Sequence, residues 1–415
     1  MRIQVRERYD YQPEHEKPLI LQSEFPRRNR ALPFLVLALV ITTGSSPLAW
    51  SYSTGNYLWA AAVSRDGRYV IIGSDDMRVY FFDVWSTDGQ PLWSYACSGY
   101  VRHVAISNNG SRAAAGDLDG NVFFFRPHQS GDPAWTFKVS GPVEALALSD
   151  DGEYLVAGDR RGVIYLFETD MEAPMIWRGA IPSAVMSLSF LESKALAVTA
   201  ASGGVYYYGE VPSRPGYAWS FGDYESFPKV VITGDNGDVV AGASNGTLYL
   251  IDRAGNVVDR QYLGGAISAL SMSTATHRVV AGSTNGNVCY FVIGGGFEKL
   301  ATLQTKQPIT SLVLSDDGQR ISIANLDGTI TTYEESLTHL VWTFHTGGII
   351  HSLSMSGSGH ITAAASDTGS LYLFNEEKLA RTGYPIYGLA PFVLVLILLL
   401  AACIATRRRR SRRAG

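Results

Sequence analysis

The chain has 415 residues, 46% of them hydrophobic and 17% charged, which excludes a largely disordered protein. Its three cysteines exclude a disulfide framework and a zinc site built from cysteines. The formal charge of −4 is unevenly spread, because residues 47–376 hold 19 basic and 32 acidic residues. An acidic body of this kind argues against nucleic acid as a partner.

The N-terminal part divides into two segments. Residues 1–30 are polar and mixed in charge, which predicts a flexible cytoplasmic tail. Residues 31–46 begin with an apolar run preceded by arginines at 27, 28 and 30, a pattern typical of a secretory signal or a short signal anchor. Cleavage after Gly44 and retention as a membrane crossing both stay open. In either case the residues that follow are expected outside the cytoplasm.

Eight copies of one repeat occupy residues 47–376, and this regularity is the strongest signal in the chain. The copies span 58–84, 101–127, 143–169, 185–211, 227–253, 267–293, 309–335 and 350–376. Each copy alternates with a period of two and has Gly, Asn or Asp at its turns, which predicts three short strands. A fourth strand between copies usually carries a tryptophan: Trp50, Trp93, Trp135, Trp177, Trp219 and Trp342. Four antiparallel strands per repeat are typical of a propeller blade.

The strand count predicts how the ring closes. The last copy has three strands, whereas Leu48–Ser53 is an isolated fourth strand before the first copy. Pairing that strand with the last copy gives an all-β, eight-bladed β-propeller without an open edge. A seven-bladed ring with one stray repeat is the alternative. Closure by Leu48–Ser53 also brings both ends of the propeller to the same blade.

The C-terminal part predicts a membrane anchor. Residues 377–385 form a linker, and residues 386–405 are 20 uncharged, mostly apolar positions, long enough for a transmembrane helix. Residues 406–415 form a basic tail with arginines at Arg407, Arg408, Arg409, Arg410, Arg412 and Arg413. The positive-inside rule puts this tail in the cytoplasm and the propeller on the extracytoplasmic side of the cell membrane. The arginines are also expected to contact anionic lipid.

The repeat resembles the WD40 and quinoprotein-like (PQQ-like) propeller families over residues 47–376. Ala105–Gly116 is similar to the start of a WD40 blade, and Gly89 to Trp93 and Gly131 to Trp135 keep the spacing of the quinoprotein tryptophan-docking repeat. Ala173 and Thr338 depart from that glycine position, and no copy has the Trp-Asp dipeptide. The resemblance therefore implies a divergent propeller, and it implies fold more than function.

No catalytic site is predicted. The sequence lacks the common metal, nucleotide and nucleophile motifs, and His103 and His351 are isolated histidines on predicted first strands. Cys97 and Cys289 are not a vicinal pair, so no quinone or other cofactor is expected. Asn109 and Asn245 begin glycosylation sequons in predicted turns, although Asn-Gly is also ordinary hairpin chemistry.

These patterns favour a membrane-anchored extracytoplasmic scaffold that binds another protein and has no enzymatic activity. A small-ligand sensor or a quinoprotein-like oxidoreductase using the central channel is one alternative, and an envelope-protein assembly factor is another. Two copies replace the usual Asp-Gly turn, and their turn residues Glu192, Lys194 and His277 are the predicted partner face.

Overall fold

The structure is a computed structural model. It describes residues 47–377 except 172–173, 192–193, 210, 212–215, 223–225, 227–228, 233–236 and 335. No helix long and apolar enough to cross a membrane occurs within these residues. The predicted tail, signal segment, transmembrane helix and basic tail lie outside the described part.

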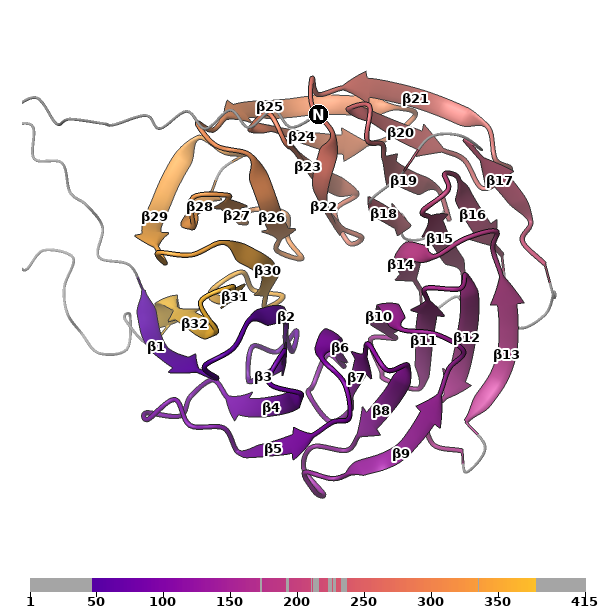
Figure 1. The fold of residues 1–415 in the computed structure, drawn as a ribbon. Coiled ribbons are helices and arrows are strands. Elements are labelled where there is room, and N and C mark those ends of the chain that lie inside the picture. The colour runs from indigo at the N-terminus through magenta and orange to yellow at the C-terminus, as the bar shows by residue number, and fades with distance from the viewer. Residues whose placement is uncertain are drawn as a thin grey trace, which may run out of the picture. The chain divides into compact units, whose positions relative to one another are not determined.

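The described residues form eight four-stranded antiparallel sheets arranged as the blades of a β-propeller (Figure 1). The innermost strand of each blade contacts the innermost strands of both neighbouring blades, so the ring is complete. Apolar residues of the second and third strands fill the space between blades, as the two-sided apolar pattern of the repeat predicts. The eight-bladed prediction is confirmed, and the seven-bladed alternative is wrong.

The strands take four positions in the blades. The innermost strands are β2 (Leu58–Val63), β6 (Val101–Ile106), β10 (Val143–Leu148), β14 (Val185–Phe190), β18 (Lys229–Ile232), β22 (Ile267–Ser273), β26 (Ile309–Leu314) and β30 (Ile350–Met355). The second strands are β3 (Tyr69–Ser74), β7 (Ala113–Asp117), β11 (Tyr154–Asp159), β15 (Leu196–Ala200), β19 (Val239–Gly242), β23 (Arg278–Ser283), β27 (Ile321–Asn325) and β31 (Ile361–Ser366). The third strands are β4 (Arg78–Asp83), β8 (Asn121–Phe125), β12 (Val163–Glu168), β16 (Val205–Tyr208), β20 (Thr247–Ile251), β24 (Asn287–Ile293), β28 (Thr329–Glu334) and β32 (Ser370–Asn375). The outermost strands are β5 (Trp93–Ala96), β9 (Pro133–Lys138), β13 (Met175–Ala180), β17 (Trp219–Phe221), β21 (Val257–Tyr262), β25 (Phe297–Gln304), β29 (His339–His345) and β1 (Leu48–Ser53).

Strand β1 closes the ring as the outermost strand of the last blade, where Figure 1 shows it beside β32. The pairing runs from Leu48 opposite Phe374 to Ser53 opposite Ser370. Trp50 is buried and stacks against Phe82 of the first blade, with ring centroids 5.4 Å apart. The predicted closure is therefore confirmed, and it joins the last blade to the first.

The outer tryptophans tie each blade to the next one. In Trp50, Trp93, Trp135, Trp219 and Trp342 the indole nitrogen donates to the residue 34 positions further along, for example from Trp93 to the Pro127 carbonyl at 3.2 Å and from Trp135 to the Thr169 carbonyl at 3.0 Å. Gly131 lies against the Trp93 side chain, and a Cβ at that glycine would come within 3.0 Å of it. This packing explains the Gly-to-Trp spacing and assigns these tryptophans to contacts between blades.

The two faces of the propeller differ in what they carry. The innermost strands begin at one face, which we call the bulge face. The other face carries the turns between first and second strands and also both ends of the described chain, so we call it the terminal face. There the Asn375 N–H donates to the Pro47 carbonyl at 2.8 Å. The predicted meeting of the two chain ends at one blade is confirmed.

Candidate functional site

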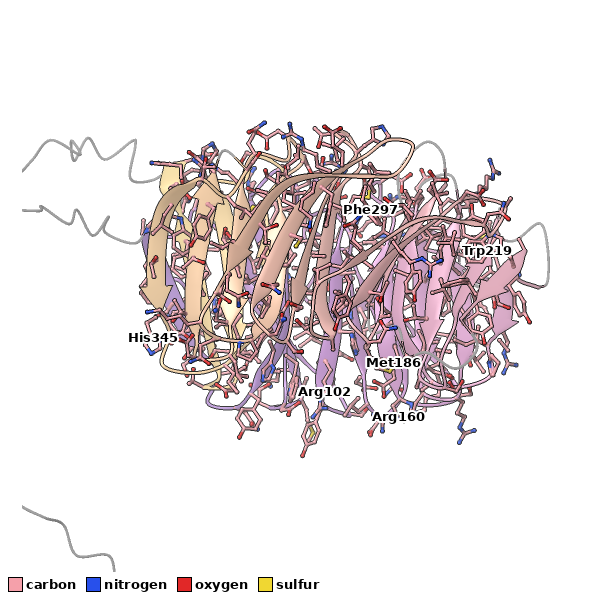
Figure 2. All side chains as sticks on the ribbon, turned by 90° about the horizontal axis from the view of Figure 1, so that it is seen from above. Arg102, Arg160, Met186, Trp219, Phe297 and His345 are labelled. Atoms are coloured by element: carbon pink, nitrogen blue, oxygen red, sulfur yellow. The ribbon has the colours of Figure 1, made fainter. Side chains whose placement is uncertain are left out.

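A ring of re-aimed side chains surrounds the propeller axis at the bulge face. Seven of the eight innermost strands have a register shift at their second residue, which is the mark of a β-bulge. The bulged residues, which we call the rim ring, are Trp59, Arg102, Glu144, Met186, Ser268, Thr310 and His351. Bulges turn a side chain away from the regular pleat and are common beside functional sites. Figure 2 shows Arg102 and Met186 at the same face of the disc.

Three neighbouring members of the rim ring form one stacked cluster. Trp59 stacks on His351 of the last blade, with ring centroids 4.1 Å apart and planes 21° apart. The Arg102 guanidinium carbon, from the second blade, lies 4.2 Å from the Trp59 ring centroid. Burial is the main cause that lowers the pKa of His351, so the imidazole stacks in its neutral form near neutral pH.

Asp75 contacts both Trp59 and Arg102 of this cluster. Its Oδ2 accepts a hydrogen bond from the Trp59 indole at 2.9 Å and contacts the Arg102 guanidinium at 3.5 Å. The residue is only 8% exposed, and its other carboxylate oxygen has no hydrogen-bond partner among the described residues. The buried Nε of Arg102 likewise has no partner in the described part of the chain. Unpaired buried atoms are costly, so this cluster is shaped for more than packing.

Large exposed side chains border the cluster. Tyr57 is 51% exposed and meets Trp59 edge-on, while Tyr100 precedes β6 and is 43% exposed. Met77, in the turn between β3 and β4, is 41% exposed. We call Tyr57, Trp59, Tyr100, Arg102 and His351 the aromatic cluster. The aromatic cluster combines exposed aromatic side chains with the Arg102 guanidinium on one side of the rim ring. The rim residues Ser268 and Thr310 are small and uncharged.

A second departure from the repeat lies one residue deeper. The third residue of the innermost strand is Ala or Ser in six blades: Ala60, Ala145, Ser187, Ala269, Ser311 and Ser352. In the other two blades the equivalent residues are His103, opposite Gly116, and Lys229, which is the first residue of β18 and lies opposite Gly242; we call them the axial pair. Burial, the Lys229 ammonium and Arg102 together lower the pKa of His103 to about 4. The Lys229 side chain is exposed among the described residues.

The other end of the axis is bridged by Arg65. Its guanidinium pairs with Asp150 of the third blade at 3.0 Å and with Asp316 of the seventh blade. Those two blades stand opposite one another in the ring, so one side chain joins turns across the axis. Backbone hydrogen bonds also link the turns of neighbouring blades, as from the Asp66 N–H to the Asn108 carbonyl at 3.0 Å. The terminal end of the axis is thus crossed by side-chain and backbone contacts between blades.

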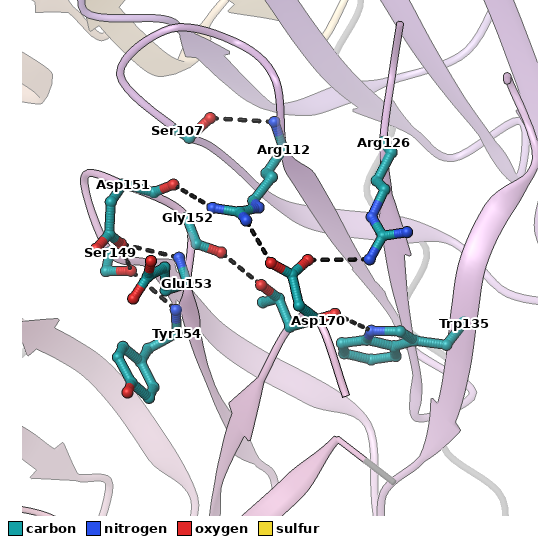
Figure 3. A network of polar contacts seen from close by, with 11 residues as sticks. Ser107, Arg112, Arg126, Trp135, Ser149, Asp151, Gly152, Glu153, Tyr154 and Asp170 are labelled. Atoms are coloured by element: carbon teal, nitrogen blue, oxygen red, sulfur yellow. Dashed lines mark hydrogen bonds and ion pairs between the residues drawn. The ribbon is translucent and has the colours of Figure 1, made fainter. Parts of the chain in front are cut away.

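A cavity of about 520 Å³ lies at the terminal face between the second and third blades. Figure 3 shows its polar network, in which Arg112 and Arg126 both pair with Asp170, the latter at 2.9 Å. The Arg112 side chain also lies over Gly152 of the next blade. Arg278 and Arg320 lie over Gly318 and Gly359 in the same way. Because this contact recurs between blades, we assign the network to blade packing.

The predicted partner face lies partly outside the described residues, since Glu192 is one of the gaps. Lys194 and His277 are half-buried at the terminal face and have φ of 64° and 53°, the left-handed conformation that glycine adopts in the other turns. The Lys194 ammonium donates to the Tyr154 hydroxyl at 2.9 Å, which raises its pKa. The structure does not test binding at these residues, which stays a prediction.

Both sequon asparagines are exposed in turns, as predicted. The Asn109 side-chain oxygen accepts from the Ser111 N–H at 3.0 Å, and that of Asn245 accepts from the Thr247 N–H at 2.8 Å. These are the turn contacts expected of Asn-Gly hairpins, and glycosylation of either residue stays a prediction.

The structure keeps the two histidines on the first strands apart. His103 lies on β6 and His351 on β30, with the first blade between them. Among the residues that the structure describes, no three His, Cys, Asp or Glu side chains gather as metal ligands do. The sequence analysis missed Trp59, Arg102 and Lys229. For Lys229 the signal is a charged residue at a strand position that is Ala or Ser in six copies, whereas the position of Trp59 and Arg102 varies from copy to copy and gives no such signal.

Comparison with known proteins agrees with this architecture. Residues 49–83 and 89–126 match the family model described as WD domain, G-beta repeat. Among similar solved structures is Sqt1 of Saccharomyces cerevisiae, at 12% identity and a TM-score of 0.69, covering 80% of this chain and 99% of that one. Sqt1 of Chaetomium thermophilum bound to the N-terminus of the ribosomal protein L10 has 13% identity and a TM-score of 0.69, with 80% and 100% covered. The C-terminal WD40 domain of Sif2 has 15% identity and a TM-score of 0.67, with 79% and 97% covered.

No curated protein sequence matches the chain. At the identities of the solved structures the likeness is one of fold. The chain is an eight-bladed β-propeller with WD40 repeats at residues 49–83 and 89–126, so the WD40 resemblance found in the sequence is confirmed.

Proposed function

We propose that this chain is a membrane-anchored, non-enzymatic scaffold whose bulge face binds another protein. The aromatic cluster carries this proposal. Trp, Tyr and Arg are the residues that most often dominate the binding energy of protein interfaces. In this chain Trp59, Tyr57, Tyr100 and Arg102 lie together at one side of the rim ring. The packing of the repeat does not require large side chains at these positions.

The cluster is suited to binding because it is held in place before a partner arrives. Trp59 is fixed by stacking on His351 and by its hydrogen bond to Asp75. A partner therefore loses less side-chain entropy on contact than it would against free side chains. The neighbouring rings of Tyr57 and Tyr100 are about half exposed and can be covered on binding.

The position of the chain ends supports an anchored scaffold. Both ends of the described chain lie at the terminal face. If residues 31–46 and 386–405 enter the bilayer, the terminal face is the one toward the membrane and the bulge face is turned away from it. The arginines at 407–410, 412 and 413 then lie in the cytoplasm beside anionic lipid, and the propeller is extracytoplasmic.

The solved neighbours support binding of a protein segment in particular. One of them, Sqt1 of Chaetomium thermophilum, is bound to the N-terminus of a ribosomal protein. We carry over from it only that a propeller of this fold takes up the end of another protein.

Photo-cross-linking in native membranes tests the proposal. A photoreactive phenylalanine analogue at Tyr57 or Tyr100 should give a defined cross-linked protein. The matched control is the same analogue at Leu92, which is 57% exposed beside β5 near the terminal face. Equal cross-linking from Leu92 and Tyr100, or none from either tyrosine, would contradict binding at the bulge face.

A further inference from the structure

We infer that Met77 is a specificity-determining contact of the bulge face and that the partner protein places an uncharged, apolar side chain over it. This inference rests on the proposed function, since that side chain belongs to the protein bound beside the aromatic cluster. It adds a residue outside the aromatic cluster to the binding surface and names the chemistry that this residue selects.

Met77 departs from the repeat at a turn where the other seven blades have glycine. The equivalent residues, all with positive φ, are Gly120, Gly162, Gly204, Gly246, Gly286, Gly328 and Gly369. Met77 has a φ of 63°, a left-handed conformation that is strained for a residue with a Cβ. Strain of this kind is typically kept at functional sites. The chain therefore retains a side chain at a turn that glycine would form without strain.

The turn of Met77 is also the one that has room for a side chain. At six of the seven glycine turns, a Cβ would lie only 2.3 to 2.8 Å from a backbone carbonyl oxygen in the link to the next blade. The corresponding link after Met77, residues 97–100, accommodates the side chain and leaves it 41% exposed. The exposed thioether is therefore a feature of the first blade and not of the repeat.

Met77 lies between the two exposed tyrosines of the aromatic cluster. The Asp75 N–H donates to the Tyr57 carbonyl at 2.9 Å, and the Cys97 N–H donates to the Met77 carbonyl at 2.7 Å. These two bonds place the turn of Met77 between the segment that ends at Tyr57 and the link that ends at Tyr100. The two tyrosines are 51% and 43% exposed. Three exposed, largely apolar side chains thus come from adjacent segments, and one partner can cover them together.

The charged residues beside Met77 already have partners within the blade. Asp76 accepts a hydrogen bond from the Arg78 N–H at 3.0 Å and another from the Tyr80 hydroxyl at 2.6 Å. The Arg78 guanidinium donates to the Ser94 hydroxyl at 2.8 Å. A polar or charged partner group placed over Met77 would lose its water without gaining an equivalent hydrogen bond there. An apolar side chain avoids that loss, and the flexible thioether adapts to its shape.

Photo-cross-linking in native membranes tests the inference, with the photoreactive phenylalanine analogue at Tyr57 as the probe. Met77→Leu keeps an apolar side chain and should change the yield of cross-linked protein by less than about twofold. Met77→Gln has nearly the same size but places an amide under the partner, so the yield should fall at least about fivefold. Met171→Gln is the matched control, because Met171 is 49% exposed in the turn between β12 and β13 at the terminal face, and it should change the yield by less than about twofold.

Met77→Gly separates binding from stability. Glycine relieves the left-handed strain, so the Tm of the full-length variant in detergent should not fall. The cross-linking yield from Tyr57 should nevertheless fall at least about fivefold, because the apolar contact is lost. A side chain that served only the fold would give the opposite pair of results.

Four outcomes would overturn the inference. Unchanged yields in Met77→Gln and Met77→Gly would remove Met77 from the binding surface, and an equal fall in Met171→Gln would remove its specificity. A higher yield in Met77→Gln than in Met77→Leu would mean that the partner places a polar group there. A fall in the Tm of Met77→Gly would assign the side chain to the fold. Absence of any cross-linked protein from Tyr57 with Met77 in place would instead refute the proposed function, and this inference with it.

Discussion

Ring closure by β1 makes a quantitative prediction for Trp50→Ala. Trp50 is 8% exposed, its ring stacks on Phe82, and Gly89 of the next blade lies against it. Truncating a buried tryptophan typically costs about 3–5 kcal/mol of unfolding free energy. For a propeller of roughly 330 residues, from 47 to 377, an unfolding entropy of about 2.1 cal/mol/K per residue converts that loss into a fall in Tm of about 4–7 °C.

The assay is thermal unfolding of the full-length protein in detergent, followed by far-ultraviolet circular dichroism. Leu48→Ala is the matched control, because Leu48 is on the same strand but 38% exposed, and it should lower Tm by no more than about 2 °C. If Trp50→Ala and Leu48→Ala melt at the same temperature, β1 does not hold the ring closed as its packing implies.

Three further predictions follow from the turns, the axis and the termini. Gly120→Ala should lower the unfolding free energy, measured by chemical denaturation, by at least about 2 kcal/mol, because φ is 87° there and a Cβ would lie 2.6 Å from the Gly141 carbonyl oxygen. Met77→Ala is the control, since Met77 already has a side chain at φ 63°, and it should lower the unfolding free energy by less than about 1 kcal/mol. Equal losses in the two variants would contradict the argument. The pKa of His103 is lowered to about 4 in the folded state, so the unfolded chain takes up a proton at higher pH than the folded one, and the unfolding free energy falls as pH drops from about 6.5 to 4. In His103→Gln this fall in unfolding free energy should be smaller by roughly 3 kcal/mol. Parallel pH profiles of the two proteins would refute the prediction. A cysteine at exposed Ser358 should react with an impermeant maleimide in intact cells and one at Ser411 only after lysis, whereas the reverse pattern would put the propeller in the cytoplasm.

Sequence was sufficient for the architecture because a repeat reports the same structure many times. The strand pattern, the glycine turns and the unpaired segment Leu48–Ser53 together predict eight blades and their closure, and the pairing of β1 with β32 confirms it. The tryptophan spacing similarly predicts packing between blades, which the donation from Trp93 to Pro127 confirms.

The candidate site could not be predicted in the same way, because it consists of departures from the repeat. His351 and Trp59 stack although 292 positions separate them, and only ring closure brings their blades together. The β-bulges that turn the rim residues are also invisible in the alternating pattern, which continues through them. Lys229 stands in a copy that keeps the usual turns, so only comparison of the same strand position in all eight copies shows that it is unusual.

The most direct test of the central claim is the affinity of the cross-linked partner for variants of the aromatic cluster. Tyr100→Ala and Arg102→Ala should each weaken binding by at least about tenfold if the cluster dominates the binding energy, and Leu92→Ala should change it less than about twofold. All three variants should unfold cooperatively, which circular dichroism checks. Unchanged affinity in Tyr100→Ala and Arg102→Ala, with both variants folded, would contradict the assignment of the bulge face as the binding surface.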